Sequence, residues 1–361
     1  MKEGRAGGEL LATPAARTPA GRPMQPNNIL PGIRALRATP LQPLKRFPWI
    51  DSVEEALTPY PRGALALIGV SGGVDSCVLL HLLRMQGFDR LIVCHLNHNL
   101  RGIESERDLD FVASICRKLD LPFYTETLKE LGHTGSPETA ARIARFEFFA
   151  RAAAKFETTS LFLGHHADDQ IETFLFNLFR GTGSFENAII KAESVTVIGE
   201  QRLILIRPLL HVWKEQLRQF ASAFHIESRE DHSNSDPQMT RNRIRNELIP
   251  EIERIVDRPI KAALLRTIEV AEKEGEFVRS HVPQLHTVKE LPVPELVQLP
   301  VAIQRRVIHG WLLFSQIADF GFAEVEAVRS LLKREKVAKI NLPRNVFCRR
   351  RAGRLFLQFS R

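Results

Sequence analysis

The sequence predicts an α/β protein, in which a doubly wound parallel sheet is followed by a smaller, mostly helical C-terminal domain. Two observations support this fold class. Short apolar runs alternate with amphipathic helical patterns between residues 49 and 208, as in sheets whose parallel strands are joined by helices. After residue 250, charged helical patterns replace the strand-like runs. We therefore expect one domain over residues 48–250 and a second unit over residues 251–361.

The strands of the first domain are expected where the sequence is most continuously apolar. Helical patterns, for example over residues 106–119 and 137–156, separate most of these runs. The runs cover residues 64–70, 90–96, 121–126, 160–165 and 202–207. Because open parallel sheets bind ligands at the carboxyl ends of their strands, the functional residues are expected at those ends.

The second unit is predicted to contain helices, a linker and a hairpin. Residues 251–285 have a charged helical pattern, and residues 289–300 indicate a proline-punctuated linker or loop set. The final segment alternates like a hairpin that turns near Ala352 and Gly353. Residues 301–335 indicate two more helices, whose apolar positions are Val307, Trp311, Leu312, Phe322, Val325, Val328 and Leu332.

Residues 1–47 differ from the rest of the chain. Most of this segment is rich in Pro, Ala and Arg, and residues 11–47 contain no acidic residue. A segment of this kind cannot bury enough apolar surface to offset the entropy lost on ordering, so we expect it to be disordered. The alternatives are an Arg-rich targeting peptide, a basic tail that contacts nucleic acid, and a start site that lies at Met24.

Charge and cysteine usage limit the function further. The formal net charge is +8, which is compatible with a polyanionic partner but is no proof of one. The four cysteines are far apart and form no CxxC pair, so a zinc or iron–sulfur site is not supported and buried, reduced thiols are expected. No apolar run approaches the ~20 residues that span a bilayer. We expect a cytoplasmic protein, or a plastid protein if residues 1–47 are a transit peptide.

The loop after the first predicted strand has the properties of a phosphate site. Its sequence is Ser71-Gly72-Gly73-Val74-Asp75-Ser76. The glycines let a ligand approach the backbone, the following helix presents free N–H groups to an anion, and the serines can donate to phosphate oxygens. The loop lacks the lysine of GxxxxGK[ST]. Asp75 would repel phosphate, but it makes sense as a ligand of Mg²⁺. An ordinary strand–helix turn is the alternative.

This hexapeptide is similar to the signature of the PP-loop, or N-type, ATP pyrophosphatases, which cleave ATP between its α and β phosphates. Further stretches follow in the order and spacing of the tRNA(Ile)-lysidine synthetases, and the chain resembles that family closely over roughly residues 62–250. The stretches are residues 95–108, 138–149, 163–183 and 206–250.

The stretch at 163–183 places two histidines and three acids at the start of a helix. Asp169 and Glu172 are three residues apart, so their carboxylates share one helix face. From the residues alone, the cluster could be an ordinary acidic helix start, a metal site or a site for an ammonium group. The resemblance implies that Asp169 and Glu172 hold the lysine substrate, with His165 nearby.

Two groups of arginines are also candidates. Arg142 and Arg145 share one helix face, and arginines alternate at residues 241, 243 and 245. Arginine binds phosphate and carboxylate through its bidentate fork, although a solvated charged surface is the usual alternative. The resemblance implies that Arg142 and Arg241 line the active site, where they contact the lysine carboxylate, the ATP phosphates or the target base. It also places His95 beside the pocket for the adenosine of ATP. From the residues alone, His95 could instead be a histidine of the core.

The resemblance implies a two-step reaction. The oxygen at carbon 2 of the wobble cytidine attacks the α-phosphate of ATP, and free L-lysine then displaces AMP. The implied catalytic residues are Asp75, Arg142, Asp169 and Arg241, with ATP and Mg²⁺ required. The implied partner is tRNA(Ile) with a CAU anticodon. No association with a membrane is expected, and a homodimer is one alternative for the assembly. A basic C-terminal tract suits RNA binding and also suits a solvated surface: Lys333, Arg334, Lys336, Lys339, Arg344, Arg349, Arg350, Arg351 and Arg354.

Other functions fit the sequence less well. A PP-loop tRNA thiolase would need cysteine pairs that the sequence lacks, and a PP-loop amidotransferase would need an ammonia source. A basic RNA-binding module with a decayed ATP site conflicts with the intact loop at residues 71–76. The chain departs from the family after RGTG, where residues 184–190 read SFENAII, so the local loop shape there is left open.

Overall fold

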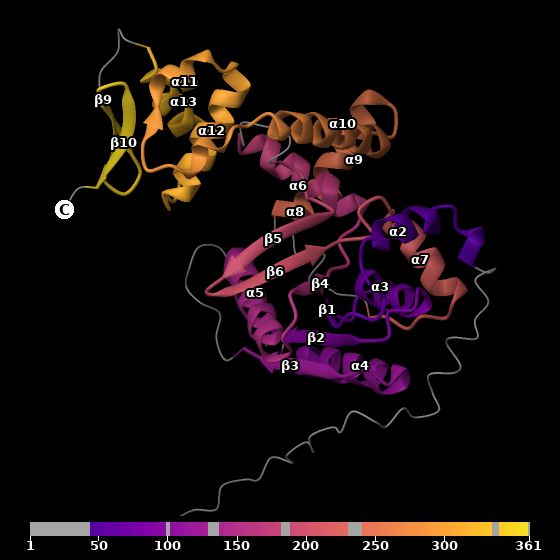
Figure 1. The fold of residues 1–361 in the computed structure, drawn as a ribbon. Coiled ribbons are helices and arrows are strands. Elements are labelled where there is room, and N and C mark those ends of the chain that lie inside the picture. Colours follow the sequence, from indigo (N-terminus) through magenta and orange to yellow (C-terminus); the bar gives the residue numbers. More distant parts are fainter. Residues whose placement is uncertain are drawn as a thin grey trace, which may run out of the picture.

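The computed structural model describes residues 44–98, 102–128, 137–181, 188–229, 240–333 and 339–359. Its N-terminal part is built on a six-stranded sheet and its C-terminal part on a four-stranded sheet (Figure 1). Most of the segment expected to be disordered, residues 1–43, lies outside the described residues. Leu44–Arg46 form a short 3-10 helix, η1, and Leu44 is buried in the core.

All five predicted strands are present and run parallel to one another. Their order across the sheet is β3-β2-β1-β4-β6. The fourth strand ends earlier than expected, at Phe162 rather than at residue 165. The strands are β1 (Ala66–Gly69), β2 (Leu91–Asn97), β3 (Phe123–Thr127), β4 (Ser160–Phe162) and β6 (Gln201–Ile206).

A sixth strand, which the sequence analysis does not predict, forms one edge of this sheet. Strand β5 (Glu193–Ile198) pairs antiparallel with β6 through a turn at Gly199, whose φ is +59°. Val195 and Val197 are exposed and alternate with more buried neighbours. This alternation is typical of an antiparallel edge strand that is solvated on one face, and it differs from the continuous apolar runs used to find the others.

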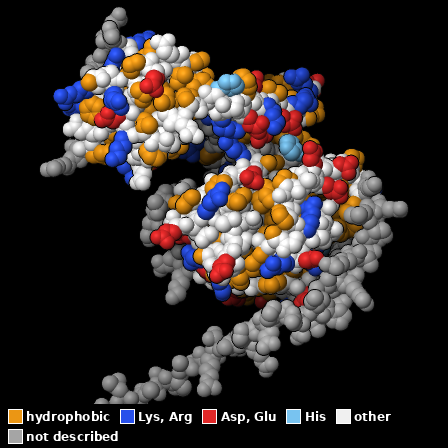
Figure 2. Space-filling model, viewed as in Figure 1, with side chains coloured by type: hydrophobic (Ala, Val, Ile, Leu, Met, Phe, Trp, Pro, Cys, Tyr) orange, Lys and Arg blue, Asp and Glu red, His pale blue; other side chains and the backbone are white. Residues whose placement is uncertain are grey.

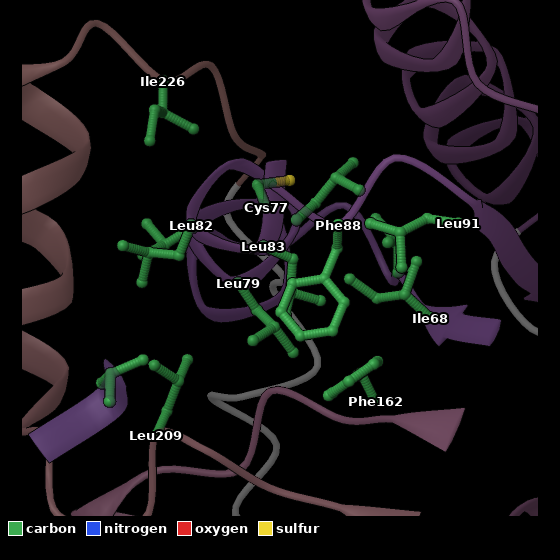
Figure 3. Packing of buried hydrophobic residues seen from close by; sticks show 14 of the residues in the cluster. Ile68, Cys77, Leu79, Leu82, Leu83, Phe88, Leu91, Phe162, Leu209 and Ile226 are labelled. Atoms are coloured by element: carbon green, nitrogen blue, oxygen red, sulfur yellow. The ribbon is translucent and has the colours of Figure 1, made fainter. Parts of the chain in front are cut away.

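Helices cover both faces of the large sheet. Successive strand residues point to opposite faces, so Ile68 packs with α2, α3, α4 and α7, whereas Leu67 packs with α5. Figure 3 shows Ile68 and Phe162 packed against the apolar side chains of α3. The helices are α2 (Ile50–Leu57), α3 (Val74–Met85), α4 (Ile103–Leu119), α5 (Pro137–Lys155) and α7 (Lys214–Ala223).

Strand β1 is the point at which the strand order reverses. The chain continues from β1 to β2 and β3 on one side, and β4 and β6 lie on the other side. Helix α3 follows β1, and helix α6 (Ala167–Phe179) follows β4. Ligands of doubly wound sheets bind at such a reversal, outside the carboxyl ends of the strands. The loops before α3 and α6 therefore define where the site is expected.

The C-terminal part begins with helices and ends in a sheet of order β7-β10-β9-β8. Trp311 lies at the centre of its core, fully buried, and its indole Nε1 donates a 3.0 Å hydrogen bond to the Val288 carbonyl. Ala352 and Gly353 have φ values of +49° and +75°, as in a two-residue hairpin turn, so the predicted turn is confirmed. The elements are α8 (Thr240–Arg243), a π-helical turn (Ile244–Leu248), α9 (Ile249–Val256), α10 (Lys261–Ser280), η5 (Gln284–Thr287), β7 (Leu291–Pro292), α11 (Val293–Gln298), α12 (Val301–Phe314), α13 (Phe322–Ser330), β8 (Lys339–Leu342), β9 (Val346–Arg351) and β10 (Arg354–Phe359).

One expectation for this part is wrong, and one apolar position differs from the others. Residues 289–300 are not only a linker, because β7 and α11 lie within them. The prolines do not prevent a helix here, because proline is tolerated in the first helical turn and Pro294 is the second residue of α11. Phe322 does not face the core but is 42% exposed at the start of α13. The other six apolar positions of α12, α13 and the turn after α13 are buried.

The four cysteines are free and buried, as expected. In the part of the chain that the structure describes, no helix is long and apolar enough to cross a membrane.

Candidate active site

The loop between β1 and α3 is held by its own hydroxyl groups. Ser76 Oγ donates to the Gly73 carbonyl at 3.0 Å and accepts from the Ser71 N–H at 3.2 Å, and the two serine hydroxyls are 3.2 Å apart. Gly72 has a φ of +98°, which other residues rarely adopt. Val74 and Asp75 begin α3, so its free N–H groups face the end of the sheet. The predicted ATP-binding residues therefore form one compact loop.

Asp75 faces two cations that the sequence analysis does not connect to it. Its Oδ2 accepts from Lys214 Nζ at 3.3 Å and lies 3.5 Å from His166 Nε2. Burial alone would raise the pKa of Asp75, but His166 and Lys214 outweigh burial and lower it, so the carboxylate is ionised. Its Oδ1 is buried, with no hydrogen-bond partner among the described residues. A carboxylate oxygen without a partner is suited to a cation.

Gly164 lets the end of β4 pass against this loop. A Cβ atom added at Gly164 would lie 3.1 Å from the Asp75 carbonyl carbon and oxygen and 3.2 Å from Ser76 Cα. These neighbours are backbone atoms, which cannot rotate away as the end of a side chain can. A residue larger than glycine at position 164 would therefore displace the loop.

We expect Gly164→Ala to raise the KM for ATP roughly tenfold to hundredfold, because a small displacement of the phosphate loop weakens every contact made there. Steady-state kinetics with varied ATP would measure this change. Gly63→Ala is the matched control, since nothing lies within 4 Å of a Cβ at that position. An unchanged KM for ATP in Gly164→Ala would show that the loop yields to the methyl group.

The start of α6 joins the loop to the acidic cluster. Asp169 Oδ2 accepts from the His166 backbone N–H at 3.0 Å, and His166 Nε2 lies 3.6 Å from the same oxygen. Burial opposes protonation of His166, but Asp169 and Asp75 outweigh it and raise the pKa of the imidazole. His166 thus lies between the two predicted catalytic carboxylates.

Asp168 has a structural role in this cluster. Its Oδ2 accepts from the Lys214 backbone N–H at 3.0 Å, and its Oδ1 accepts from Lys261 Nζ at 2.8 Å. These contacts tie the first residues of α7 and α10 to the start of α6. Burial would raise the pKa of Asp168, but the contacts with Lys261 and Lys214 lower it.

We expect Asp168→Asn to destabilise the fold by about 1.5–3 kcal/mol near neutral pH, the range for hydrogen bonds to charged groups. Because the folded-state pKa is lowered, this stabilisation is present above the unfolded pKa of about 4 and is lost as the pH falls through the folded value. Thermal unfolding should show a large difference in stability between Asp168→Asn and the unmodified protein at pH 7, and a smaller difference at pH 3. An equal difference at both pH values would contradict the assignment.

Glu172 is bound by an arginine within the protein. Arg245 Nε and Nη2 donate to its two carboxylate oxygens at 2.5 and 3.0 Å, and Arg245 Nη2 is 3.8 Å from Asp169 Oδ1. The Glu172 side chain is 4% exposed, whereas that of Asp169 is 23% exposed. Arg245 lies in the π-helical turn, a rare geometry that often marks functional sites. Asp169 and Glu172 do share one face, but Glu172 already has a cation.

A large cleft lies on the other side of the end of β4. Its volume is about 1310 Å³, and Arg142, His165 and Arg241 are among its lining residues, as the sequence analysis expects of an active site. Asp75, Asp169 and Glu172 do not line it. The adjacent residues His165 and His166 thus belong to different sides, one to the cleft and the other to the acidic cluster.

Arg207 is a cleft residue that the sequence analysis does not single out. It follows β6 directly, and its Nη1 donates to the Lys191 carbonyl at 2.7 Å and to Ser194 Oγ at 3.0 Å. Burial, and then the like charges of Arg142 and Arg145, lower its pKa to about 10. Its position could have identified it from the sequence, because Arg207 is a charged residue directly after an apolar strand. Crowded arginines of this kind favour an anion.

The histidines differ in charge. Burial, and then the charges of nearby arginines, hold the pKa of His165 well below its usual range, so this imidazole is neutral. His95 is buried and its Nδ1 lies 2.8 Å from the Val70 carbonyl, which fits the core-histidine alternative. Within the described ranges, no group of three or more His, Cys, Asp or Glu side chains could hold a metal ion by itself. The metal alternative for the cluster after β4 therefore has no support.

The basic C-terminal tract serves partly structural roles. Arg350 Nη1 donates to the carbonyls of Leu331 and Leu332, and Arg344 pairs with Asp319 at 2.7 Å. Residues 334 and 336 lie outside the described ranges, as does most of the SFENAII segment.

The loop before α3, at the reversal point of a doubly wound sheet, defines a PP-loop nucleotide-binding protein. Residues 50–252 match the model of the PP-loop domain family, and residues 291–356 match that of the TilS substrate binding domain. Proteins named tRNA(Ile)-lysidine synthase are similar along most of the chain. The Solibacter usitatus protein is 34% identical over 282 residues, covering 75% of this chain and 62% of the relative. The Chlorobaculum tepidum protein is 34% identical over 230 residues, covering 62% and 67%. The chain therefore belongs to the tRNA(Ile)-lysidine synthase family.

Across the curated relatives that it matches, the chain aligns with between 46% and 67% of the length of the relative. Among solved structures, the U34-tRNA thiolase NcsA from Methanococcus maripaludis, with its [4Fe-4S] cluster, has a TM-score of 0.50. The alignment covers 64% of this chain and 80% of that one at 17% sequence identity. This likeness concerns the fold alone.

Proposed function

We propose that this protein uses ATP to attach free L-lysine to carbon 2 of the wobble cytidine in tRNA(Ile) with a CAU anticodon, giving lysidine, AMP and pyrophosphate. The observation that carries the proposal is the arrangement around the end of β4. A phosphate-binding loop and an acidic cluster lie on one side, and an arginine-lined cleft large enough for a nucleotide lies on the other. Family membership supports the same activity.

In the first step, the carbon-2 oxygen of cytidine attacks the α-phosphorus and pyrophosphate leaves. The loop at residues 71–76 would hold the phosphates through backbone N–H groups and the Ser71 hydroxyl. The unpartnered Oδ1 of Asp75 fits a Mg²⁺ ligand. Such an ion, when bound with ATP, would neutralise phosphate charge. Lys214, 3.3 Å from Asp75, would add a second positive charge at the same place.

In the second step, the ε-amine of lysine attacks carbon 2 and AMP leaves. The amine must lose a proton before it attacks, and Asp169 is the more accessible acid of the predicted pair. We assign Glu172 to holding Arg245 beside Asp169, and through it to shaping the lysine site. Arg142, Arg207 and Arg241 would hold the RNA phosphate or the lysine carboxylate from the cleft. His165 is neutral and so adds no positive charge there.

Incorporation of radiolabelled lysine into a tRNA(Ile) transcript with a CAU anticodon tests the proposal. We expect label in the RNA only when ATP and magnesium are both present, and none in a transcript whose wobble cytidine is replaced by uridine. Pyrophosphate release that requires the tRNA but leaves no lysine label would reject lysine as the nucleophile. No reaction under any of these conditions would reject the activity.

A further inference from the structure

The C-terminal part supplies the second wall of the arginine-lined cleft. Arg305, Arg306 and His309 from α12 line this wall, and Phe322 at the start of α13 lines it with them. Figure 2 shows Lys and Arg side chains near the hollow between the two parts of the molecule. The first wall, to which α5, α6 and β5 contribute, contains Arg142. RNA in the cleft would therefore contact both parts at once.

The two walls share one arrangement of side chains. On the first wall, the guanidinium of Arg142 lies 5.1 Å from the centre of the Phe146 ring. On the second wall, the guanidinium of Arg305 also lies 5.1 Å from the centre of the Phe322 ring. Bases stack on aromatic rings and on arginine planes in single-stranded nucleic-acid sites. Each wall thus offers a surface on which a base can stack.

Phe322 is not needed by the core. It is 42% exposed and is not among the side chains packed against the C-terminal core, which include its neighbour Phe320. Its ring is held instead by Arg305, which is itself fixed by Glu326 at 2.7 Å. Exposure of this apolar ring to water is unfavourable, and a ligand that packs against it would bury it.

The second wall also carries concentrated positive charge. Arg305 and Arg306 line it, whereas His309 is uncharged, because burial and then the charge of Arg306 lower its pKa. Burial likewise lowers the pKa of Arg306. Glu274 is the only acid among the described residues that line the cleft. Stacking surface beside desolvated cations fits a nucleotide, with its base and phosphate, better than it fits an acidic peptide.

We infer that Phe322, Arg305 and Arg306 form a nucleotide clamp, which stacks an unpaired base of the anticodon loop beside the modified cytidine and holds its phosphate. This inference rests on the proposed function. It assigns the α12–α13 wall a direct part in presenting the wobble nucleotide, in addition to any contact elsewhere on the tRNA. The base on Phe322 would then lie next to the cytidine in the anticodon loop, and Phe146 on the first wall would stack the cytidine itself or its other neighbour.

Binding of a fluorescent anticodon stem–loop of tRNA(Ile) to the full chain tests the clamp without requiring catalysis. We expect Phe322→Ala to weaken binding roughly five- to hundredfold, the range for losing one stacked base. Phe322→Trp should restore it, because tryptophan also stacks. Arg306→Ala should reduce the slope of log Kd against log salt by about 1.

Phe314→Ala is the matched control, since Phe314 is 53% exposed on α12 but does not line the cleft. It should leave stem–loop binding unchanged. If Phe322→Ala weakens binding of the whole tRNA but not of the stem–loop, the site contacts another part of the tRNA and the inference is wrong. If it weakens neither, the clamp does not exist. Absence of lysine incorporation by the unmodified protein would instead reject the proposed function, whatever the binding results show.

Discussion

Replacing Asp75 by alanine is expected to reduce ATP-dependent lysine incorporation by roughly two to three orders of magnitude, comparable with the loss of a group that stabilises transition-state charge. Asp75 combines an ionised carboxylate with an unpartnered buried oxygen at the start of α3. No neighbouring acid lies in the same loop to replace it. Single-turnover lysine incorporation at saturating tRNA would measure the effect.

Asp110→Ala is a suitable control for this experiment, because Asp110 is an exposed acid on α4. Both variants should bind tRNA as the unmodified protein does, since Asp75 is not among the lining residues of the cleft. Full lysine incorporation by Asp75→Ala would exclude its role at the phosphates. Loss of tRNA binding would point to misfolding of the loop.

The second large effect concerns the pair of Glu172 and Arg245. Removing one partner of a buried ion pair leaves an uncompensated charge, and such changes cost about 3–5 kcal/mol. We expect Glu172→Ala to lower the free energy of unfolding by about this amount, reduced somewhat because Arg245 is 25% exposed. Thermal or urea unfolding would measure the loss. The double variant with Arg245→Ala should cost less than the sum of the single changes.

Glu247→Ala is the matched control for this pair. Glu247 accepts from Arg243 at 3.4 Å in the same helical segment, but both side chains are more than half exposed. Exposed pairs contribute about 0–1 kcal/mol, so little destabilisation is expected. Additive losses in the Glu172 and Arg245 double variant would show that the two residues act independently.

The sequence predicts the main features of the fold because they depend on local patterns. Continuous apolar runs mark the five parallel strands, and the turn at Ala352 and Gly353 follows from residues that accept positive φ. Strand β5 is missed because its pattern alternates and its pairing with β6 is antiparallel. The sequence groups Phe322 with the other apolar positions of α12 and α13, because helical spacing does not show which apolar residue at a helix start faces a cleft.

The candidate residues are predicted better than their partners. The resemblance brings Asp75, Asp169 and Glu172 to one region, and the structure places them around His166 and Arg245. Lys214 is 139 positions from Asp75 in the chain, and no local spacing signals that contact. The same holds for Lys261 and Asp168. Sequence patterns identify the acids, whereas tertiary packing decides which cation each acid receives.

The extended backbone at the end of β4 makes chain length there unusually important. His165 and His166 are consecutive, and His166 has extended angles, φ −130° and ψ −179°. Side chains alternate sides in extended chain, so removing or adding one residue between Phe162 and His165 would exchange the two imidazoles. Because the neighbours of each imidazole set its pKa, the ring that came to face the carboxylates would have its pKa raised, and the ring that came to face the arginines would have its pKa lowered. A one-residue insertion or deletion would also shift Gly164 relative to the backbone of Asp75 and Ser76, so the length of this segment matters as much as its residues.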